Sequence, residues 1–158
     1  MTITAYDLAQ RFVGIREVAG PVANAQILAM LRLDAGTAIA DDATAWCSAF
    51  VNYVAWLLRL PRSKSLAARS WLSVGRIVEL ELARPGFDVV ILKRGGGDQP
   101  GPEVLDAVGH VGFFAGLARG DDGSATVAVL GGNQGDAVSI ARFPSTQVLG
   151  VRRLSDDL

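Results

Sequence analysis

The sequence contains few of the residues that most often form disulfides and metal sites. Its 158 residues include one cysteine, Cys47, and one histidine, His110. A single cysteine excludes an intrachain disulfide and fits synthesis in a reducing compartment. A zinc site takes three or four ligands drawn from cysteine, histidine and carboxylates, and these two residues are far apart in the chain. We therefore expect neither a bound metal nor a cofactor.

The chain also lacks an excess of one charge and a long hydrophobic run. Fifteen basic and sixteen acidic residues give a formal net charge of −1, so nothing favours binding to a phosphate backbone, and nucleic acid is not an expected partner. No apolar run approaches the roughly 18 residues that span a bilayer. The first twelve residues lack the basic and apolar regions of a secretory signal. We expect one soluble domain over residues 1–158, made in the cytoplasm without a signal peptide.

Half of the residues are hydrophobic, and their spacing predicts an α+β fold. The first half is helical in pattern, and the expected helices are 6–17, 22–33, 46–58 and 66–74. Apolar residues surround nearly the whole circumference of 46–58, so this helix is expected to be central and buried. Its start can be capped by Asp41, Asp42 or Thr44.

The second half is rich in valine, isoleucine and phenylalanine and predicts about five mostly antiparallel strands packed on the central helix. The expected strands are 87–93, 109–117, 125–130, 137–143 and 148–152. The turn residues 121–123 predict a hairpin. The glycine-rich segment 94–102 predicts a flexible loop, and it lacks the Gly-Lys-Ser/Thr ending of a phosphate-binding loop.

Cys47 falls in the first turn of the expected buried helix. Free backbone N–H groups and the positive end of the helix dipole favour an anion there, and these would stabilise a thiolate. A lone cysteine beside apolar residues is more often a small buried hydrophobe, so its position alone does not make it a nucleophile.

His110 begins the expected strand 109–117, where a lone histidine is most often structural. Because the chain has one thiol and one imidazole, an enzyme that uses both must pair Cys47 with His110. In such sites a third side chain orients the imidazole. Asn133 follows the next strand and is the expected third residue, although asparagine between glycines is also typical of a plain turn. Gln134 and Asp136 remain alternatives.

Four sequence blocks occur in a characteristic order: WCSAFVNY at 46–53, AARSWL at 67–72, GHVGFF at 109–114 and VLGGNQ at 129–134. Together they resemble the CHAP family (cysteine, histidine-dependent amidohydrolases/peptidases) of the NlpC-type papain-like superfamily, and in particular its small phage- and prophage-associated branch. The resemblance covers about residues 41–153. The chain departs from the family at Ala45, where relatives often have proline, and at 85–89, where Pro-Gly-Phe-Asp-Val replaces the usual Pro-Gly-Asp-Val.

The resemblance implies a papain-like α+β fold that hydrolyses an amide bond of bacterial peptidoglycan. It makes Cys47 the nucleophile, His110 the base and then the acid, and Asn133 the orienting residue. The backbone N–H of Cys47 becomes an oxyanion donor. Some relatives hold calcium, but two aspartates beside the nucleophile are too few oxygen ligands for calcium.

Substrate contacts are expected from Trp46, Trp71 and Gln134, although an aromatic ring beside an apolar helix is more often part of the core. The expected biological role is that of a phage or prophage endolysin, which acts on the wall after release through a holin. Three alternatives stay open: a non-catalytic wall-binding or structural module, a transglutaminase-type acyltransferase, and an injected antibacterial amidase with its own immunity protein.

Overall fold

The structure is a computed structural model that describes residues 1–39 and 44–157. The helical elements are α1 (Ala5–Gln10), α2 (Ala25–Ala35), α3 (Cys47–Leu57) and three short 3-10 helices, η1 (Ala68–Ser73), η2 (Leu80–Leu82) and η3 (Ser145–Gln147). The strands are β1 (Arg76–Val78), β2 (Asp88–Lys93), β3 (Gly109–Arg119), β4 (Ala125–Gly131), β5 (Ser139–Pro144) and β6 (Val148–Arg153). They form an antiparallel sheet in the order β1-β6-β2-β3-β4-β5. The predicted α+β class and the antiparallel sheet are confirmed.

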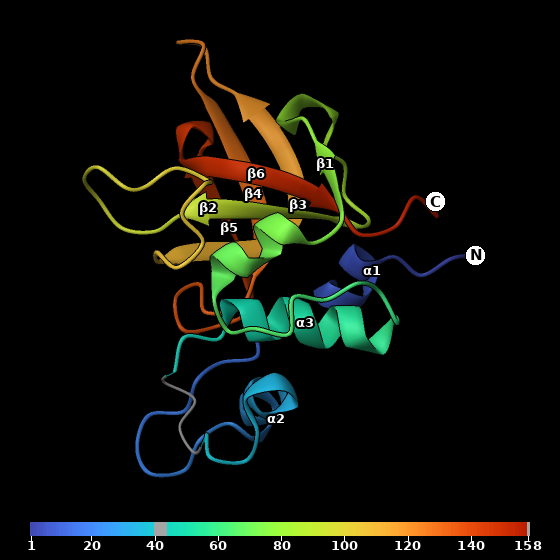
Figure 1. Cartoon of the computed structure of the whole chain (residues 1–158), viewed down its shortest axis with the longest axis vertical. Coiled ribbons are helices and arrows are strands. Elements are labelled where there is room, and N and C mark those ends of the chain that lie inside the picture. Colours follow the sequence, from blue (N-terminus) through green and yellow to red (C-terminus); the bar gives the residue numbers. More distant parts are fainter. Residues whose placement is uncertain (40–43, 158) are drawn as a thin grey trace.

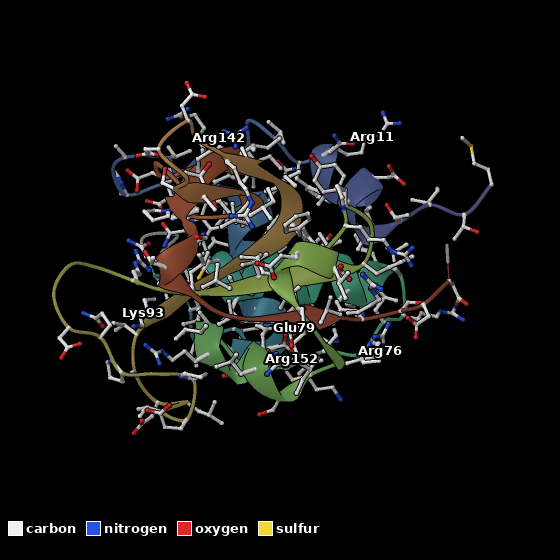
Figure 2. The ribbon with its side chains drawn as sticks, turned by 90° about the horizontal axis from the view of Figure 1, so that it is seen from above. Arg11, Arg76, Glu79, Lys93, Arg142 and Arg152 are labelled. Atoms are coloured by element: carbon white, nitrogen blue, oxygen red, sulfur yellow. The ribbon has the colours of Figure 1, made fainter. Side chains whose placement is uncertain are left out.

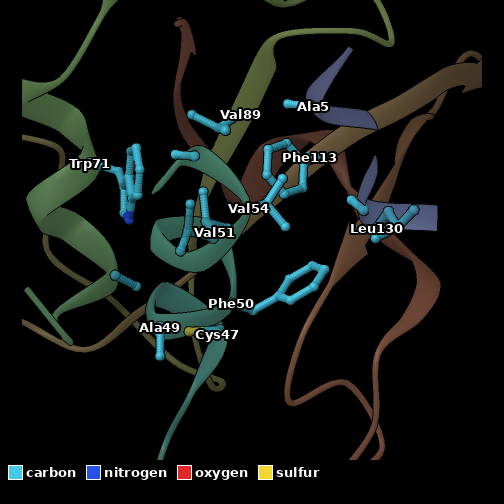
Figure 3. Packing of buried hydrophobic residues seen from close by; sticks show 14 of the residues in the cluster. Ala5, Cys47, Ala49, Phe50, Val51, Val54, Trp71, Val89, Phe113 and Leu130 are labelled. Atoms are coloured by element: carbon cyan, nitrogen blue, oxygen red, sulfur yellow. The ribbon is translucent and has the colours of Figure 1, made fainter. Parts of the chain in front are cut away.

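Helix α3 lies between the sheet and α2, as Figure 1 shows, while α1 and η1 also pack close to it. Its residues are buried on nearly every side, which confirms the prediction of a central helix. The Phe50 ring projects from α3 toward the sheet and meets Phe113 of β3 edge to face, with ring centroids 6.0 Å apart (Figure 3). Burying a phenylalanine side chain contributes about 2–3 kcal/mol, so this contact anchors the helix on the sheet.

The start of α3 differs from the prediction. Trp46 occupies the N-cap position and makes no side-chain capping hydrogen bond. Thr44 is therefore not the cap, because the helix begins three residues after it. The other two expected caps, Asp41 and Asp42, lie outside the described residues. The first N–H groups of α3 thus have no capping side chain at the N-cap position.

The first predicted helix is also shorter than expected, since α1 ends at Gln10. The chain then runs beside residues 136–138, where Gly14 N–H donates to the Val138 carbonyl at 3.0 Å and Val138 N–H donates to the Ile15 carbonyl at 2.8 Å. Gly14 has a φ of 97°, which a right-handed helix does not allow. These contacts replace the second half of the expected helix with an irregular segment.

Strand β1 was not predicted. It has three residues, pairs with β6 and lies at the sheet edge. The segment 66–74 forms the 3-10 helix η1 rather than an α-helix, and the turn at 121–123 joins β3 to β4 as expected. Among the described residues, no helix is both long and apolar enough to cross a bilayer.

Candidate active site

Cys47 is the first residue of α3, and its side chain is only 2% exposed. Burial raises the pKa of the Cys47 thiol above its ordinary value, because a charge is costly in an apolar site. The backbone of Val111, the positive charge of Arg94 and the backbone of Ser48 and of Cys47 itself oppose this rise in the pKa. Cys47 thus lies in the first turn of α3, where free N–H groups and the helix dipole favour an anion.

The Val111 contact brings Cys47 to the strand that carries His110. The pairing of β3 with β4 begins at Phe113 and Leu130. The first residues of β3, 109–112, lie before this pairing begins. The start of α3 reaches this end of the sheet, where Cys47 and Val111 belong to the same buried cluster. Val111 follows His110 directly, so the thiol lies near the segment that carries the imidazole, although His110 is paired with Leu92, which packs on the other face of the sheet.

The orientation of the His110 ring is set by Gln134. His110 Nε2 and Gln134 Oε1 are 2.8 Å apart. The amide nitrogen of Gln134 donates to two backbone carbonyls, at 2.7 Å to Ser139 and at 3.2 Å to Val129. Since carbonyls only accept, these bonds fix the amide with Oε1 toward the ring. His110 Nε2 must then carry the proton, which leaves Nδ1 as the basic nitrogen.

His110 is 6% exposed, and its ring lies 5.5 Å from that of Phe143. Burial lowers the pKa of the His110 imidazole below its ordinary value, the hydrogen bond to Gln134 raises it, and the positive charge of Arg94 lowers it. The net direction is downward. With the thiol pKa raised and the imidazole pKa lowered, the resting pair at neutral pH is a thiol and a neutral imidazole.

Two glycines, Gly131 and Gly132, allow the chain between the end of β4 and Gln134 to pass close to the His110 and Trp46 rings. A Cβ on Gly131 would lie 2.6 Å from Gln134 Oε1 and 3.3 Å from His110 Nε2. A Cβ on Gly132 would lie 2.6 Å from the Trp46 ring. Neither position has space for a side chain, so the Gly-Gly pair fits the segment tightly between the imidazole and the start of α3.

The third residue at the site differs from the one expected. The structure places the Gln134 amide, and not that of Asn133, on the imidazole. Asn133 is half-buried with a φ of 58°, a left-handed conformation that asparagine tolerates in turns. Asp136, the other alternative, is exposed. Gln134 is 8% exposed and its amide is fully engaged, so it is not available as the substrate contact that was also expected of it.

The two tryptophans expected at the substrate are fully buried. Trp46 Nε1 donates to Glu17 at 2.7 Å, and Trp71 Nε1 donates to the Ser48 hydroxyl at 2.9 Å. Neither ring is exposed to a ligand in this structure, so their placement supports a role in the core.

A polar network behind Cys47 was missed from sequence. The Ser48 hydroxyl donates to the Ser65 carbonyl at 2.6 Å, and the Asn52 amide donates to the same carbonyl at 3.2 Å. Lys64 N–H donates to the Asn52 Oδ1 at 3.0 Å. The only sequence feature that could have indicated this network is the pair Ser48 and Asn52, which are four positions apart on an otherwise apolar helix. The network ties the first turns of α3 to the segment that precedes η1.

A second missed residue is Arg69, which is fully buried in η1. Its Nε donates to the Val108 carbonyl at 2.8 Å, and its Nη1 donates to Gly101 at 2.7 Å and to two further carbonyls of the same loop. The segment 94–102 was expected to be a flexible loop. The irregular segment extends to residue 108, and its second half is bound to the buried guanidinium directly before β3.

Comparison with protein-family models, curated proteins and solved structures yields no match to this chain. Within residues 1–39 and 44–157, no group of three or more histidine, cysteine or carboxylate side chains is placed to hold a metal ion. The groups that the structure describes in this region include a thiol at a helix N-terminus and a basic imidazole nitrogen. These groups suit acyl transfer.

Proposed function

We propose that the protein is a cysteine amidohydrolase or peptidase that cleaves an amide bond in the stem peptide of bacterial peptidoglycan. The observation that carries the proposal is the Gln134–His110 bond, which leaves the imidazole Nδ1 basic on the strand that the only thiol of the chain approaches. The choice of peptidoglycan as substrate rests on the four sequence blocks that resemble CHAP hydrolases. The papain-like identity of the α+β fold is part of the same proposal.

In the proposed mechanism, His110 Nδ1 takes the proton from the Cys47 thiol as the sulfur attacks the amide carbonyl carbon. A resting thiol suits this step, because the base removes the proton only when substrate is in place. The backbone N–H of Cys47 stabilises the negative oxygen of the tetrahedral intermediate. His110 then gives the proton to the leaving amine, and a thioester forms on Cys47.

The second half of the reaction uses the same groups. His110 takes a proton from a water molecule, the hydroxide attacks the thioester, and the acid product leaves as the proton returns to the sulfur. Gln134 holds Nε2 throughout and stabilises the imidazolium that forms at each step. It acts as a positioning residue, since it touches the ring and not the substrate.

The test is the clearing of a purified peptidoglycan suspension, with mass spectrometry of the released fragments. Wild-type protein is expected to lower the turbidity and to release new amino and carboxyl termini, while Cys47→Ala is expected to do neither. Asn133→Gly serves as the control, because this residue lies beside Gln134 but does not hold the imidazole, and glycine keeps its positive φ. The fragment masses identify which amide bond is cut.

Other outcomes point to other functions. Binding to peptidoglycan without cleavage by either protein indicates a wall-binding module and contradicts the proposal, as does equal clearing by wild type and Cys47→Ala. Incorporation of an added amine without net hydrolysis indicates an acyltransferase. The proposed site of action is the bacterial cell wall after release. Lysis that depends on a holin favours an endolysin, whereas neutralisation by a dedicated immunity protein favours an injected effector.

A further inference from the structure

The end of helix α3 lies beside a surface pocket that the proposed mechanism does not use. The pocket has a volume of about 450 Å³, which is within the range of small-molecule binding sites. It is lined by Trp56, Leu57, Arg59, Leu60 and Arg62. Trp56 is nine positions after Cys47 on the same helix, which corresponds to about 14 Å along its axis. The pocket is therefore separate from the candidate active site, and we call it the α3-end pocket.

Trp56 gives this pocket an exposed aromatic surface. Trp56 is 48% exposed, whereas the other two tryptophans are fully buried. The Tyr53 ring packs against the indole, with ring centroids 5.8 Å apart. The face of an indole ring carries partial negative charge, and the C–H groups on one face of a sugar ring carry partial positive charge, so the two rings can stack. Trp56 is thus suited to bind a sugar.

Arg59 occupies a backbone position that favours glycine. Arg59 N–H donates to the Trp56 carbonyl at 3.1 Å, and Leu60 N–H donates to the Ala55 carbonyl at 2.8 Å. These two bonds form the Schellman motif that ends many helices, in which the residue at the position of Arg59 has a positive φ and is usually glycine. Arg59 has a φ of 56°. A side chain at such a position strains the backbone, and backbone strain of this kind clusters at functional sites.

The charges around Arg59 favour an anionic ligand. Within residues 1–39 and 44–157, the Arg59 guanidinium has no hydrogen-bond or ion-pair partner. Arg62, in the same pocket, is paired with Asp34 at 3.0 Å. The sequence contains no acidic residue between Asp42 and Glu79. An exposed guanidinium without an acidic partner can form two parallel hydrogen bonds with an incoming carboxylate.

An exposed arginine is not by itself a binding site. Figure 2 shows three others on separate elements: Arg11 at the end of α1, Arg76 on β1 and Arg142 on β5. None of these three has a positive φ, and Arg76 is paired with Asp156. Arg59 differs because an unpaired charge, a glycine-type backbone position and a pocket with an exposed aromatic ring occur together there.

Peptidoglycan contains a sugar that matches these features. N-acetylmuramic acid has a sugar ring with a lactyl group, whose carboxylate is free wherever no stem peptide is attached. We propose that the α3-end pocket binds an acidic sugar of this kind, with the ring stacked on Trp56 and the carboxylate bound by Arg59. The identity of the sugar rests on the proposed peptidoglycan function. The inference adds a second site, which holds the protein on the glycan strand.

The experiment compares two monosaccharides, N-acetylmuramic acid and N-acetylglucosamine, which differ by the lactyl group and its carboxylate. Each is titrated into the ¹⁵N-labelled full chain, and NMR follows the backbone N–H signals of residues 56–60 and the indole N–H signal of Trp56. Wild-type protein is expected to bind N-acetylmuramic acid about 10- to 100-fold more tightly, as one charge-assisted contact allows. Cys47→Ala is expected to show the same preference, because binding does not require the thiol.

Arg59→Gly removes the guanidinium and is compatible with the positive φ. It is expected to bind the two sugars with affinities within about twofold of each other, and to unfold at a temperature about 2–4 °C above that of wild type. A lost preference is then not a loss of fold. Arg59→Lys keeps the charge but not the paired donors, and it is expected to retain part of the preference.

Lys64→Gly is the matched control. Lys64 is also exposed and has a φ of 55°, but it does not line the pocket. This variant is expected to keep the wild-type preference for N-acetylmuramic acid. Trp56→Ala removes the stacking surface, and it is expected to weaken the binding of both sugars by about 10-fold or more.

Three results would overturn the inference. Equal affinity of wild type for the two sugars, or a preference that Arg59→Gly retains, would show that Arg59 does not bind the carboxylate. The absence of signal shifts with either sugar at its highest soluble concentration would show that the pocket does not bind these sugars. All three are independent of the hydrolase proposal, which the clearing of peptidoglycan tests. Binding of N-acetylmuramic acid without clearing would leave the pocket assignment standing and the hydrolase proposal contradicted.

Discussion

The two ends of helix α3 have opposite surroundings. At its start, Cys47, Ser48 and Asn52 are buried, and the N-cap side chain makes no capping hydrogen bond to the first turn. At its end, Trp56 is 48% exposed and Leu57 is 42% exposed. Single apolar side chains exposed to water are common on protein surfaces and do not by themselves indicate a functional site. A buried helix start with a thiol at its first residue suits a developing negative charge, and the proposed chemistry therefore uses this end of the helix.

The largest loss of activity is expected from changes at Cys47, at the buried start of α3. Cys47→Ala removes the nucleophile, and hydrolysis of peptidoglycan is expected to fall by roughly four orders of magnitude or more. Cys47→Ser keeps the size and polarity of the side chain and is expected to lose nearly as much activity. Turbidity clearing measures both, and circular dichroism verifies that each variant is folded. Residual clearing near the wild-type rate in either folded variant would contradict a catalytic role for the buried end.

Gln134→Leu is expected to reduce kcat by about 10- to 100-fold, since the imidazole loses the partner that sets its tautomer. The variant also leaves the carbonyls of Val129 and Ser139 without their amide donor, which costs about 1–3 kcal/mol of stability. Asn133→Gly removes the amide but allows the same positive φ, and it is expected to keep kcat within about twofold. Steady-state kinetics on soluble muropeptides would decide between the two amides, and a larger loss in Asn133→Gly would reverse their assignment.

Asn133 and Gln134 also show how much of the site the sequence can predict. The spacing of apolar residues gave the central helix and five of the six strands, and the single thiol and single imidazole left one possible pairing. The identity of the third residue depends on the backbone of a turn. Because Asn133 has a φ of 58°, the chain reverses there and brings the next side chain, that of Gln134, to the ring. The spacing of apolar residues in the sequence does not indicate the backbone conformation of this turn.

Other features were missed for similar physical reasons. Strand β1 has three residues, too few for a period-2 pattern to be recognised. The burial of Arg69 was not predicted, because its partners are backbone carbonyls of a distant loop. Every residue has a backbone carbonyl, so the sequence of the loop does not identify these partners. The burial of Trp46 and Trp71 depends on tertiary packing, which composition does not reveal.

Asn52→Leu tests the polar network that holds the buried end in place. The change leaves the Lys64 N–H without its acceptor and removes one donor to the Ser65 carbonyl, so the free energy of unfolding is expected to fall by about 2–3 kcal/mol. Urea denaturation measures this loss. A stability equal to that of wild type would show that the network does not fix the start of α3.

The pH dependence follows from the shifted imidazole. Hydrolysis requires neutral His110, and because its pKa lies below 6.5, the acid limb of kcat/KM is expected to have its midpoint below pH 6.5. Arg94→Ala removes a positive charge that lowers this pKa, so the limb should move to higher pH. Gln134→Leu removes a bond that raises the pKa, and the limb should move to lower pH. Shifts in the opposite directions would contradict the described electrostatics.

The smallest effect is expected at the exposed end of α3. Trp56 packs against Tyr53, with ring centroids 5.8 Å apart, so Trp56→Ala is expected to reduce stability by about 1 kcal/mol and to leave kcat/KM unchanged. Thermal denaturation and the muropeptide assay measure the two quantities. A marked loss of activity would show that the two ends of the helix do not differ in function as described.

The tautomer of the only histidine tests the central claim most directly. Ring nitrogens of His110 give one pair of ¹⁵N signals in the whole protein, so NMR assignment needs no variant. Above pH 6.5 the account predicts a proton on Nε2 and an unprotonated Nδ1. A proton on Nδ1 at the same pH would leave the thiol without its base and would contradict the proposed mechanism.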